Sequence, residues 1–514
     1  MKANRAVVES RARVRTCSRL NPWWAAAPWW VLARARSWML VAGLLAGGAL
    51  AGLLAGCAMA PRYERPAPPV PSQFPTPGES GAAQAESPAA PAGAPAAKAA
   101  TELQWPQYFA DARLRAVLER ALQNNRDLRM AALNVERAAA MYRVQRSQLS
   151  PTFGIQAAGQ ITRIPERMTD EDAETSEQYT VEVGFMSWEI DLFGRLRNQK
   201  TSAREQYLAT DETRRAVHTS LVAAVAATWF SLAADMERLK LAEATIEAQT
   251  ATRDLIRASR DAGVASDLDL SQAESQVEAA RASRAENAGA VQIDRHTLDL
   301  LAGAPVPADL LPAGLENLPD LPELAAGVPS EVLLARPDIL AAEHLLRAAY
   351  ADVGAARAAL FPRISLTAAL GTLSPDLAGL FGDDTHTWRL APLGQVPIYG
   401  GGGPRASHKA AKIQREIAVA SYEKAIQSAF AEVADALTLR ATLREQREIW
   451  DRLLRAQEET LRLSEARYQA GIDGYLGVLV AQRTLYASRQ IGVALRLAER
   501  NNQVSLYKAL GGGE

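Results

Sequence analysis

The side chains that could carry out chemistry are few and scattered along this 514-residue sequence. Its five histidines and two cysteines show no spacing typical of a metal site. The His-Glu-x-x-His, Gly-x-Ser-x-Gly and Gly-x4-Gly-Lys-Ser/Thr signatures of metalloproteases, serine hydrolases and nucleotide-binding proteins are all missing. The sequence therefore predicts no catalytic residue, no bound metal and no cofactor, and indicates that the protein is not an enzyme.

Two other features look like ligand sites but have plainer interpretations. The run Gly400–Gly403 precedes a predicted helix, as a phosphate-binding loop does, but no Lys-Ser/Thr follows it. We interpret Gly400, and Gly194 at the matching place in the first half of the chain, as strand-to-helix turns. Asp267 and Asp269 follow a short turn and are typical of a helix N-terminus, where carboxylates stabilise free backbone N–H groups.

Cys57 is the one side chain for which the sequence predicts covalent chemistry. It ends the uncharged run Ser37–Cys57, which follows a basic region as in a secretory signal. Its last four residues, Leu54-Ala55-Gly56-Cys57, resemble the bacterial lipobox, whose Cys is acylated and becomes the new N-terminus. We expect residues 1–56 to be a lipoprotein signal peptide and Cys57 to carry acyl chains such as palmitate. Ala58, rather than Asp, favours sorting to the outer membrane.

A transmembrane helix is the alternative for the uncharged run, which has about the length that a bilayer requires.

The charge balance of the chain argues against a nucleic-acid-binding protein. The chain has 57 Lys and Arg against 58 Asp and Glu, so it lacks the basic excess typical of nucleic-acid-binding proteins, and we expect no nucleic-acid partner. Residues 57–102 are rich in Pro, Ala and Ser, a composition that buries little surface and predicts an extended tether.

The two halves of the folded part repeat each other. The matched segments are Asn125–Leu128 with Arg336–Ile339 and Pro151 with Pro362, both at an offset of 211 residues, and Ala262–Val264 with Ala470–Ile472 at an offset of 208. Repeats of this size suggest a duplicated domain. We expect the repeats to span residues 103–304 and 330–514, with a Pro-rich linker at 305–329 between them.

Each half has the same predicted order of elements: a helix, two strands, a very long helix and a returning helix. The first helix spans about Asp111–Leu149. Neither Arg195–Ala262 nor Arg405–Ala470 contains Gly or Pro, which predicts two helices about 100 Å long. Helices of this length imply coiled-coil packing rather than a compact enzyme. Short turns follow them at Gly263–Ser266 and Gly471–Gly474.

Four segments alternate apolar and polar residues over the length that a membrane β-strand needs. They are Phe153–Ile161, Tyr179–Trp188, Arg363–Thr372 and Trp388–Tyr399. A small soluble sheet is the alternative. Because four strands cannot close a barrel and open edges are not tolerated in lipid, strands that span must come from several chains sharing one barrel. The acidic segment Glu166–Gln178 between the first two strands is expected to be an extracellular loop.

Several stretches together resemble the outer-membrane factor lipoproteins, the TolC-like channels of tripartite efflux pumps. They are Leu122–Leu128, Trp188–Arg195, Ala335–Asp338, Ala355–Arg357, Phe361–Pro362, Gly471–Leu476 and Ala481–Arg483. The resemblance covers roughly Trp105 to Gly513. It implies a mainly α fold: a long α-helical coiled-coil barrel with a small transmembrane β-barrel of four strands per chain, internally duplicated and homotrimeric. It also implies a periplasmic adaptor protein, an inner-membrane pump and outer-membrane lipid as partners.

We therefore expect an outer-membrane channel that conducts small molecules passively, with energy from the pump, because this chain has no nucleotide site. Drugs or other toxic organic compounds are the favoured cargo. The alternatives are a duct for type I protein secretion or for metal-ion efflux, and an anchored coiled-coil spacer without a conducting lumen. Metal ducts often carry Met or His clusters, and the 8 Met and 5 His here form none in the sequence.

The turns that end the two long helices are expected to form the periplasmic tip and its gate. The predicted tip residues are Asp267, Asp269, Asp473, Tyr475, Leu476 and Val480. Relatives often have acidic rings just after the second turn, where this sequence has Gly477 and Val480. We expect Leu476 and Val480 to close an apolar constriction that excludes water, and the three aspartates to form a cation-attracting rim. Ordinary helix packing by Leu476 and Val480 is the alternative.

Overall fold

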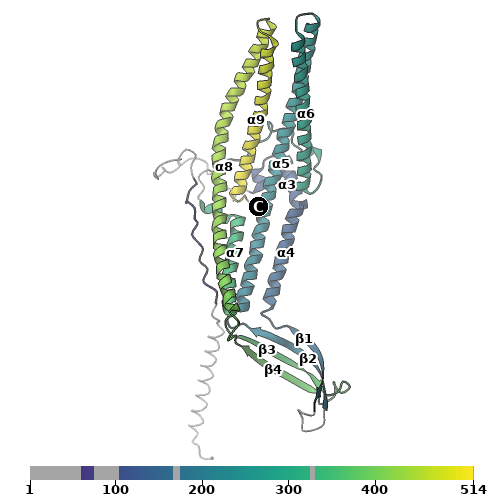
Figure 1. Ribbon diagram of the computed structural model, residues 1–514, viewed down its shortest axis with the longest axis vertical. Coiled ribbons are helices and arrows are strands. Elements are labelled where there is room, and N and C mark those ends of the chain that lie inside the picture. The colour runs from purple at the N-terminus through teal and green to yellow at the C-terminus, as the bar shows by residue number, and fades with distance from the viewer. Residues whose placement is uncertain (1–58, 75–103, 166–173, 325–329, 513–514) are drawn as a thin grey trace, which may run out of the picture. The chain divides into compact units, whose positions relative to one another are not determined.

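The computed structural model describes residues 59–74, 104–165, 174–324 and 330–512. The chain divides into two compact units, Met1–Cys57 and Ala58–Glu514. The first unit, with the predicted signal peptide and Cys57, lies outside the described residues. The second unit consists of long helices and one four-stranded sheet (Figure 1).

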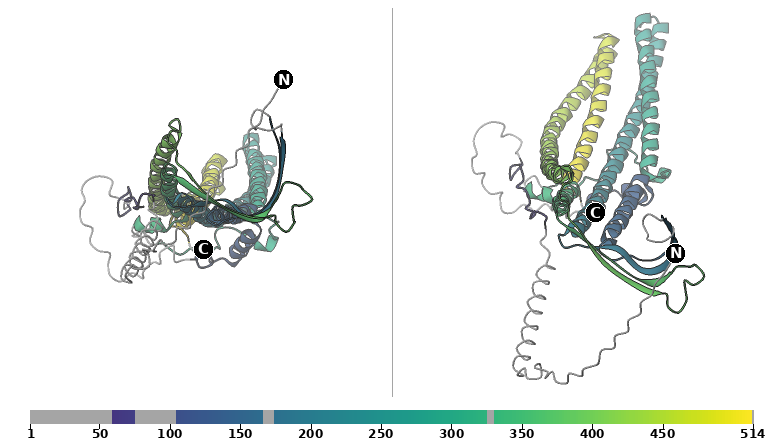
Figure 2. Two further views of the ribbon diagram at one scale, coloured as in Figure 1. Left: turned by 90° about the horizontal axis from the view of Figure 1, so that it is seen from below. Right: turned by 60° about the horizontal axis from the view of Figure 1, so that its bottom comes forward.

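Both halves contain the predicted order of elements. In the first half they are α2 (Trp105–Tyr108), α3 (Ala112–Asn124), α4 (Arg126–Ser147), β1 (Phe153–Ile164), β2 (Glu174–Ile190), α5 (Arg195–Asp261) and α6 (Asp267–Ala302). After η3 (Ala308–Leu310) and η4 (Ser330–Ala335), the second half holds α7 (Pro337–Ala358), β3 (Arg363–Ser374), β4 (His386–Gln395), α8 (Gly403–Gln469) and α9 (Tyr475–Ala509). The hairpins α5/α6 and α8/α9 extend side by side away from the sheet (Figures 1 and 2).

The prediction of one helix over Asp111–Leu149 was wrong, because the chain forms two helices separated at Asn125. Asn125 has an extended backbone, and its side-chain oxygen accepts a hydrogen bond from the Leu128 N–H at 2.9 Å, which caps α4. Its amide donates to the Leu301 carbonyl near the end of α6 at 2.9 Å. In the second half, Arg336 at the matching position donates to the Ala509 carbonyl at 2.6 Å. The break therefore serves a contact that ties each returning helix to the start of its repeat.

Several strand boundaries also differ from the prediction, and the two largest differences are at the start of β2 and the end of β4. Residues 174–178, expected in the loop Glu166–Gln178, extend β2, because their backbone still pairs with the end of β1. Residues 166–173 lie outside the described part of the chain. The strand β4 ends at Gln395 rather than Tyr399, because its partner β3 begins at Arg363, opposite Gln395, and leaves the following residues nothing to pair with.

The four strands form one antiparallel sheet in the order β1-β2-β3-β4, so β1 and β4 are its edges. The pairing of β2 with β3 joins the two repeats and is interrupted by a bulge between Phe185 and Trp188. Figure 2 shows the sheet as one curved layer at the end of the helices opposite the hairpin turns. Among the described residues, no strand pairs with the outer side of β1 or of β4.

Segments that the composition predicted to be spacers also pack on the helices. In the inter-repeat segment, four leucines at a spacing of three are buried in the main core: Leu315, Leu318, Leu321 and Leu324. The buried Trp229 of α5 donates its indole N–H to the Leu310 carbonyl at 3.2 Å. Residues 59–74, part of the predicted tether, pack as well, because Tyr63, Val70 and Phe74 supply apolar area among the prolines.

Candidate channel wall and tip

The strand-to-helix turns place a glycine in the left-handed conformation before each long helix. Gly194 precedes α5 with φ 76°, and Gly402 precedes α8 with φ 83°. Gly400, which the sequence comparison paired with Gly194, lies two residues earlier and accepts a hydrogen bond from the Gly403 N–H at 3.0 Å. Both helices have 67 residues, so with Gly402 as the partner of Gly194 they correspond at an offset of 208 along their whole length.

The sheet has one apolar and one polar face. Residues directly opposite each other in neighbouring strands share a face, and the registers group apolar side chains from all four strands: Phe153 and Ile155, Val181, Val183 and Phe185, Leu366, Ala368 and Leu370, and Trp388 and Leu390. Several of these, such as Ile155 and Trp388, are exposed to solvent in the single chain. An apolar face of this kind suits the lipid side of a membrane barrel.

The opposite face carries the polar side chains, including Gln156, Gln160, Thr180, Glu182, Thr387 and Arg389. Glu182 on β2 is buried and accepts a hydrogen bond from Arg389 on β4 at 2.9 Å, reaching across β3. The intervening β3 residue opposite Glu182 is Gly371, which leaves room for this pair. A polar face with an internal ion pair suits the water-filled side of a barrel.

At the far end of the helices, Tyr475 is buried rather than exposed, with 2% of its surface accessible. It packs with Val478 and Leu479 of α9 against Ile256 of α5 and Ala273 of α6. Burial raises the pKa of Tyr475 to about 12. Tyr475 therefore belongs to a small core that joins the two hairpins near their ends.

Leu476 and Val480, the residues expected to form the constriction, are both exposed, at 58% and 55%. They lie one helical turn apart, so they share one face of α9. Val264 and Leu268 at the other turn are also exposed, and they correspond to Ile472 and Leu476 at the offset of 208. Sequence reasoning missed this second apolar pair, although the repeat offset contained the signal.

The three predicted tip aspartates are engaged within the chain. Asp473 accepts two hydrogen bonds from Arg467, at 2.5 and 3.1 Å, and these lower its pKa. Asp269 forms a capping box with Ser266, and Asp267 lies 3.7 Å from Arg260. Arg467 and Arg260, which sequence reasoning missed, therefore offset part of the negative charge that was expected at the rim. Cys57 lies outside the described residues.

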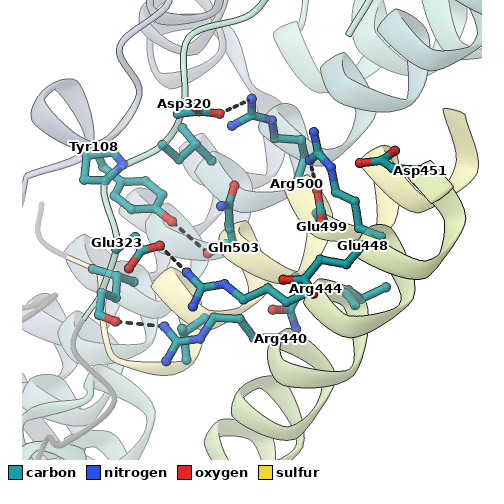
Figure 3. Close-up of a pocket in the computed structure, with 17 residues that line it drawn as sticks. Tyr108, Asp320, Glu323, Arg440, Arg444, Glu448, Asp451, Glu499, Arg500 and Gln503 are labelled. Carbon is teal, nitrogen blue, oxygen red and sulfur yellow. Dashed lines mark hydrogen bonds and ion pairs between the residues drawn. The ribbon is translucent and has the colours of Figure 1, made fainter. Parts of the chain in front are cut away.

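A cavity of 690 Å³ lies between the inter-repeat segment and the helices α8 and α9 (Figure 3). It is rich in arginine, and each of its four arginines has a partner in the chain: Arg440 with the Leu324 carbonyl, Arg444 with Glu323, Arg447 with Glu499, and Arg500 with Asp320. Three of these pairs fasten the inter-repeat segment to the helices, and the pair of Arg447 with Glu499 joins α8 to α9. The arrangement leaves no arginine of this cavity unpaired for an anionic ligand.

The sequence matches the family model described as Outer membrane efflux protein over residues 117–304 and 328–512, one stretch in each half. The chain belongs to the outer membrane efflux protein family. One relative is the toluene efflux pump outer membrane protein TtgC of Pseudomonas putida. It is 42% identical over 458 residues, which are 88% of this chain and 92% of TtgC.

Two solved structures share the fold. The crystal structure of a membrane protein from Pseudomonas aeruginosa is 37% identical with a TM-score of 0.81, and covers 89% of this chain and 98% of its own. The open state of the MtrE outer membrane channel of Neisseria gonorrhoeae is 35% identical with a TM-score of 0.77, and covers 89% and 98%.

These comparisons confirm the predicted fold class and location. The protein is the outer-membrane component of an efflux pump, with an internally duplicated, homotrimeric helical barrel and a β-barrel segment. The family consists of channels rather than enzymes, and outer-membrane components of efflux pumps work with adaptor and inner-membrane partners.

Proposed function

We propose that three copies of this chain enclose a passive duct that carries small organic molecules from a periplasmic adaptor and an inner-membrane pump across the outer membrane. The observation that carries the proposal is the two-faced sheet with two free edges, which only further copies can close in lipid. The cargo class is supported by TtgC, whose name assigns it to a toluene efflux pump. The chain itself acts as a conduit and performs no catalysis.

The internal repeat indicates how the copies meet. The helix α7 packs between α5 and α8, whereas its counterpart α4 packs mainly on α5 and buries no residue within the described chain. At the α7–α5 contact, His344 Nδ1 lies 2.7 Å from Glu205 Oε2. The repeat offsets relate these two residues to Leu133 on α4 and Ile413 on α8, which are both exposed apolar residues. We therefore place α8 of the next copy over α4, with Ile413 against Leu133.

The repeat offsets also predict how the two edge strands of the sheet pair between copies. Since β1 and β3 correspond at an offset of 211, the two hairpins are equivalent. Their corresponding pairs are Phe153–Phe185 and Ile364–Gly394. Between the hairpins, Phe185 pairs with Ala368. The equivalent pair across two copies is Ala157 with Gly394 of the next copy, which keeps the apolar side chains of β1 and β4 on one face.

This register predicts a specific cross-link between copies. Ala158 and Leu393 of the next copy are then direct neighbours on the polar face, so the double variant Leu393→Cys/Ala158→Cys should form disulfide-linked trimers on oxidation. The control Leu393→Cys/Ala157→Cys places the thiols on opposite faces and should remain unlinked. Denaturing gels without reductant measure the outcome. Equal linkage in both variants, or none in the first, would contradict the proposed register.

At the tip, we place the gate at Leu476 and Val480, where three copies bring six exposed apolar side chains toward one axis. Tyr475 does not line this face, because it is buried in the small core between the two hairpins, where its packing supports α9. The three aspartates contribute a weaker cation-attracting rim than their number suggests, because Arg467 and Arg260 lie beside two of them. At the other end of the chain, we propose that Cys57 carries acyl chains, which metabolic labelling with palmitate tests.

A further inference from the structure

One ion pair crosses the polar face of the sheet from β2 to β4, over the strand β3. Arg389 of β4 donates to Glu182 of β2 at 2.9 Å, and the Glu182 side chain keeps only 7% of its surface accessible. Neighbouring strands lie about 4.8 Å apart, so a flat sheet would separate the two backbones by roughly 10 Å. A buried carboxylate is costly without its partner. The Glu182–Arg389 pair therefore favours a sheet in which β2 and β4 approach each other on this face.

The strands β2 and β3 meet at two glycines that leave no room for a side chain. A Cβ atom on Gly371 of β3 would lie 2.0 Å from the Val181 carbonyl oxygen of β2. A Cβ atom on Gly184 of β2 would lie 2.1 Å from the Ala368 carbonyl oxygen of β3. Any larger residue at either position must push the two strands apart. Glycines and bulges bend a sheet, and the bulge of β2 follows directly after Phe185.

The ion pair and the two glycines occupy the same part of the sheet. Glu182 lies opposite Gly371 in the ladder. Gly184 lies opposite Ala369, whose partner on β4 is Arg389. The ion pair therefore passes over two β3 positions that carry little or no side chain. Because the polar face is the inner, concave face of a barrel, an attraction across it and a close β2–β3 contact both bend the sheet in the direction that closure requires.

The seam between copies, where β1 of one copy is proposed to pair with β4 of the next, repeats neither feature. The strands β1 and β3 correspond at an offset of 211, and the pairs Phe153–Phe185 and Ile364–Gly394 relate β2 to β4. The residues that correspond to Glu182, Gly184, Gly371 and Arg389 are, in that order, Ala391, Leu393, Gln160 and Thr180. The ion pair and the glycines therefore belong to the junction of the two repeats within one chain.

We propose that Glu182, Arg389 and Gly371 are positioning residues that curve the sheet of each chain, so that its free edges meet those of the other copies at the angle needed for pairing. The inference rests on the proposed function, because it requires three chains to share one barrel. A chain that already has this curvature loses less freedom when the seam forms, which is the usual advantage of pre-organisation. These residues act on the wall of the channel rather than on its cargo.

Glu182→Ala/Arg389→Ala tests the ion pair without leaving an unpaired buried charge. It is made in the seam reporter Leu393→Cys/Ala158→Cys. We expect the yield of seam disulfides on denaturing gels to fall about tenfold, because the edges no longer arrive pre-organised. Sedimentation in detergent should still show trimers, since the contact proposed between α4 and α8 is unchanged. The matched control is Thr180→Ala/Thr387→Ala, which shortens two side chains on the same strands and face and should leave both measurements unchanged.

Gly371→Ala tests the β2–β3 contact while both charges remain. Its methyl group must displace the β2 backbone, so we expect the seam disulfides to decrease as they do without the ion pair. Gly154→Ala on β1 is the matched control, because a Cβ atom there meets nothing within 4 Å. Gly154→Ala should link as the reporter does, and the helical circular dichroism of both glycine variants should equal that of the wild type.

The two measurements separate curvature from general stability. Seam disulfides that are undiminished in Glu182→Ala/Arg389→Ala or in Gly371→Ala would overturn the inference. It would also be overturned if trimers and seam disulfides were lost together, because the residues would then support folding rather than position the edges. If the reporter itself forms no seam disulfide, the inference fails together with the proposed register. A reporter that links normally, with variants that link equally well, overturns the inference alone.

Discussion

Leu133→Asp is expected to abolish the trimer and leave a folded single chain. In the arrangement proposed for α4 and the α8 of the next copy, this change buries a carboxylate against Ile413 at three symmetric contacts. An unpaired buried charge costs about 3 kcal/mol or more at each contact, and the single chain loses nothing because Leu133 is exposed in it. Sedimentation in detergent measures the assembly state, and helical circular dichroism measures folding.

The same substitution on the matching helix of the second repeat provides the control. Leu345 on α7 is also exposed, but its counterpart on α4 is the polar Asn134. This position is therefore not part of the apolar contact proposed between copies. Leu345→Asp should keep the trimer. Adding Ile413→Lys to Leu133→Asp should restore part of it through an ion pair. A stable Leu133→Asp trimer would show that α8 of the next copy does not cover this face of α4.

Val480→Asp is expected to raise the resting conductance of the channel about tenfold, the change produced by about 1.4 kcal/mol in the barrier to ion entry. Three carboxylates would hydrate a constriction that excludes water when it is lined by valine and leucine. They would also create a site at which multivalent cations block the current. Single-channel recording in planar bilayers, with and without such cations, measures both effects.

Gln272→Asp is the matched control, because Gln272 on α6 corresponds to Val480 at the offset of 208. It places the same charge on the other hairpin and should leave resting conductance unchanged. Asp473→Asn removes the partner of Arg467, so it should weaken cation selectivity with little change in conductance. A Val480→Asp channel with ordinary conductance and no cation block would count against an apolar gate.

The long helices and their turns could be predicted because their signal is local. A stretch such as Arg195–Ala262, without Gly or Pro, contains none of the residues that commonly end a helix. Both long helices end within one residue of the prediction. The strands were also predictable, since alternation of apolar and polar residues reflects a sheet with two different faces. Repeat offsets then located the second half from the first.

The remaining differences come from long-range contacts that a local pattern does not contain. Asn125 interrupts a helix because its amide reaches Leu301 in another element. Tyr475 is buried because α5 and α6 lie against it, although its neighbours in sequence are exposed. In the run Gly400–Gly403, sequence similarity between the two halves matched Gly400 with Gly194. In the structure α8 begins at Gly403, so the left-handed residue before it is Gly402. The hydrogen bonds from Tyr63 and Arg65 to Glu343 join residues about 280 positions apart and had no signal in the composition of the tether.

A conducting lumen is the property that separates a duct from an anchored coiled-coil spacer. The most direct test is the single-channel conductance of purified Leu393→Cys/Ala158→Cys trimers, locked by their disulfides and inserted in planar bilayers. We predict a discrete ionic current that persists after locking, rises with Val480→Asp, and is absent from Leu133→Asp single chains. Locked, membrane-inserted trimers that carry no current, with or without Val480→Asp, would contradict the duct.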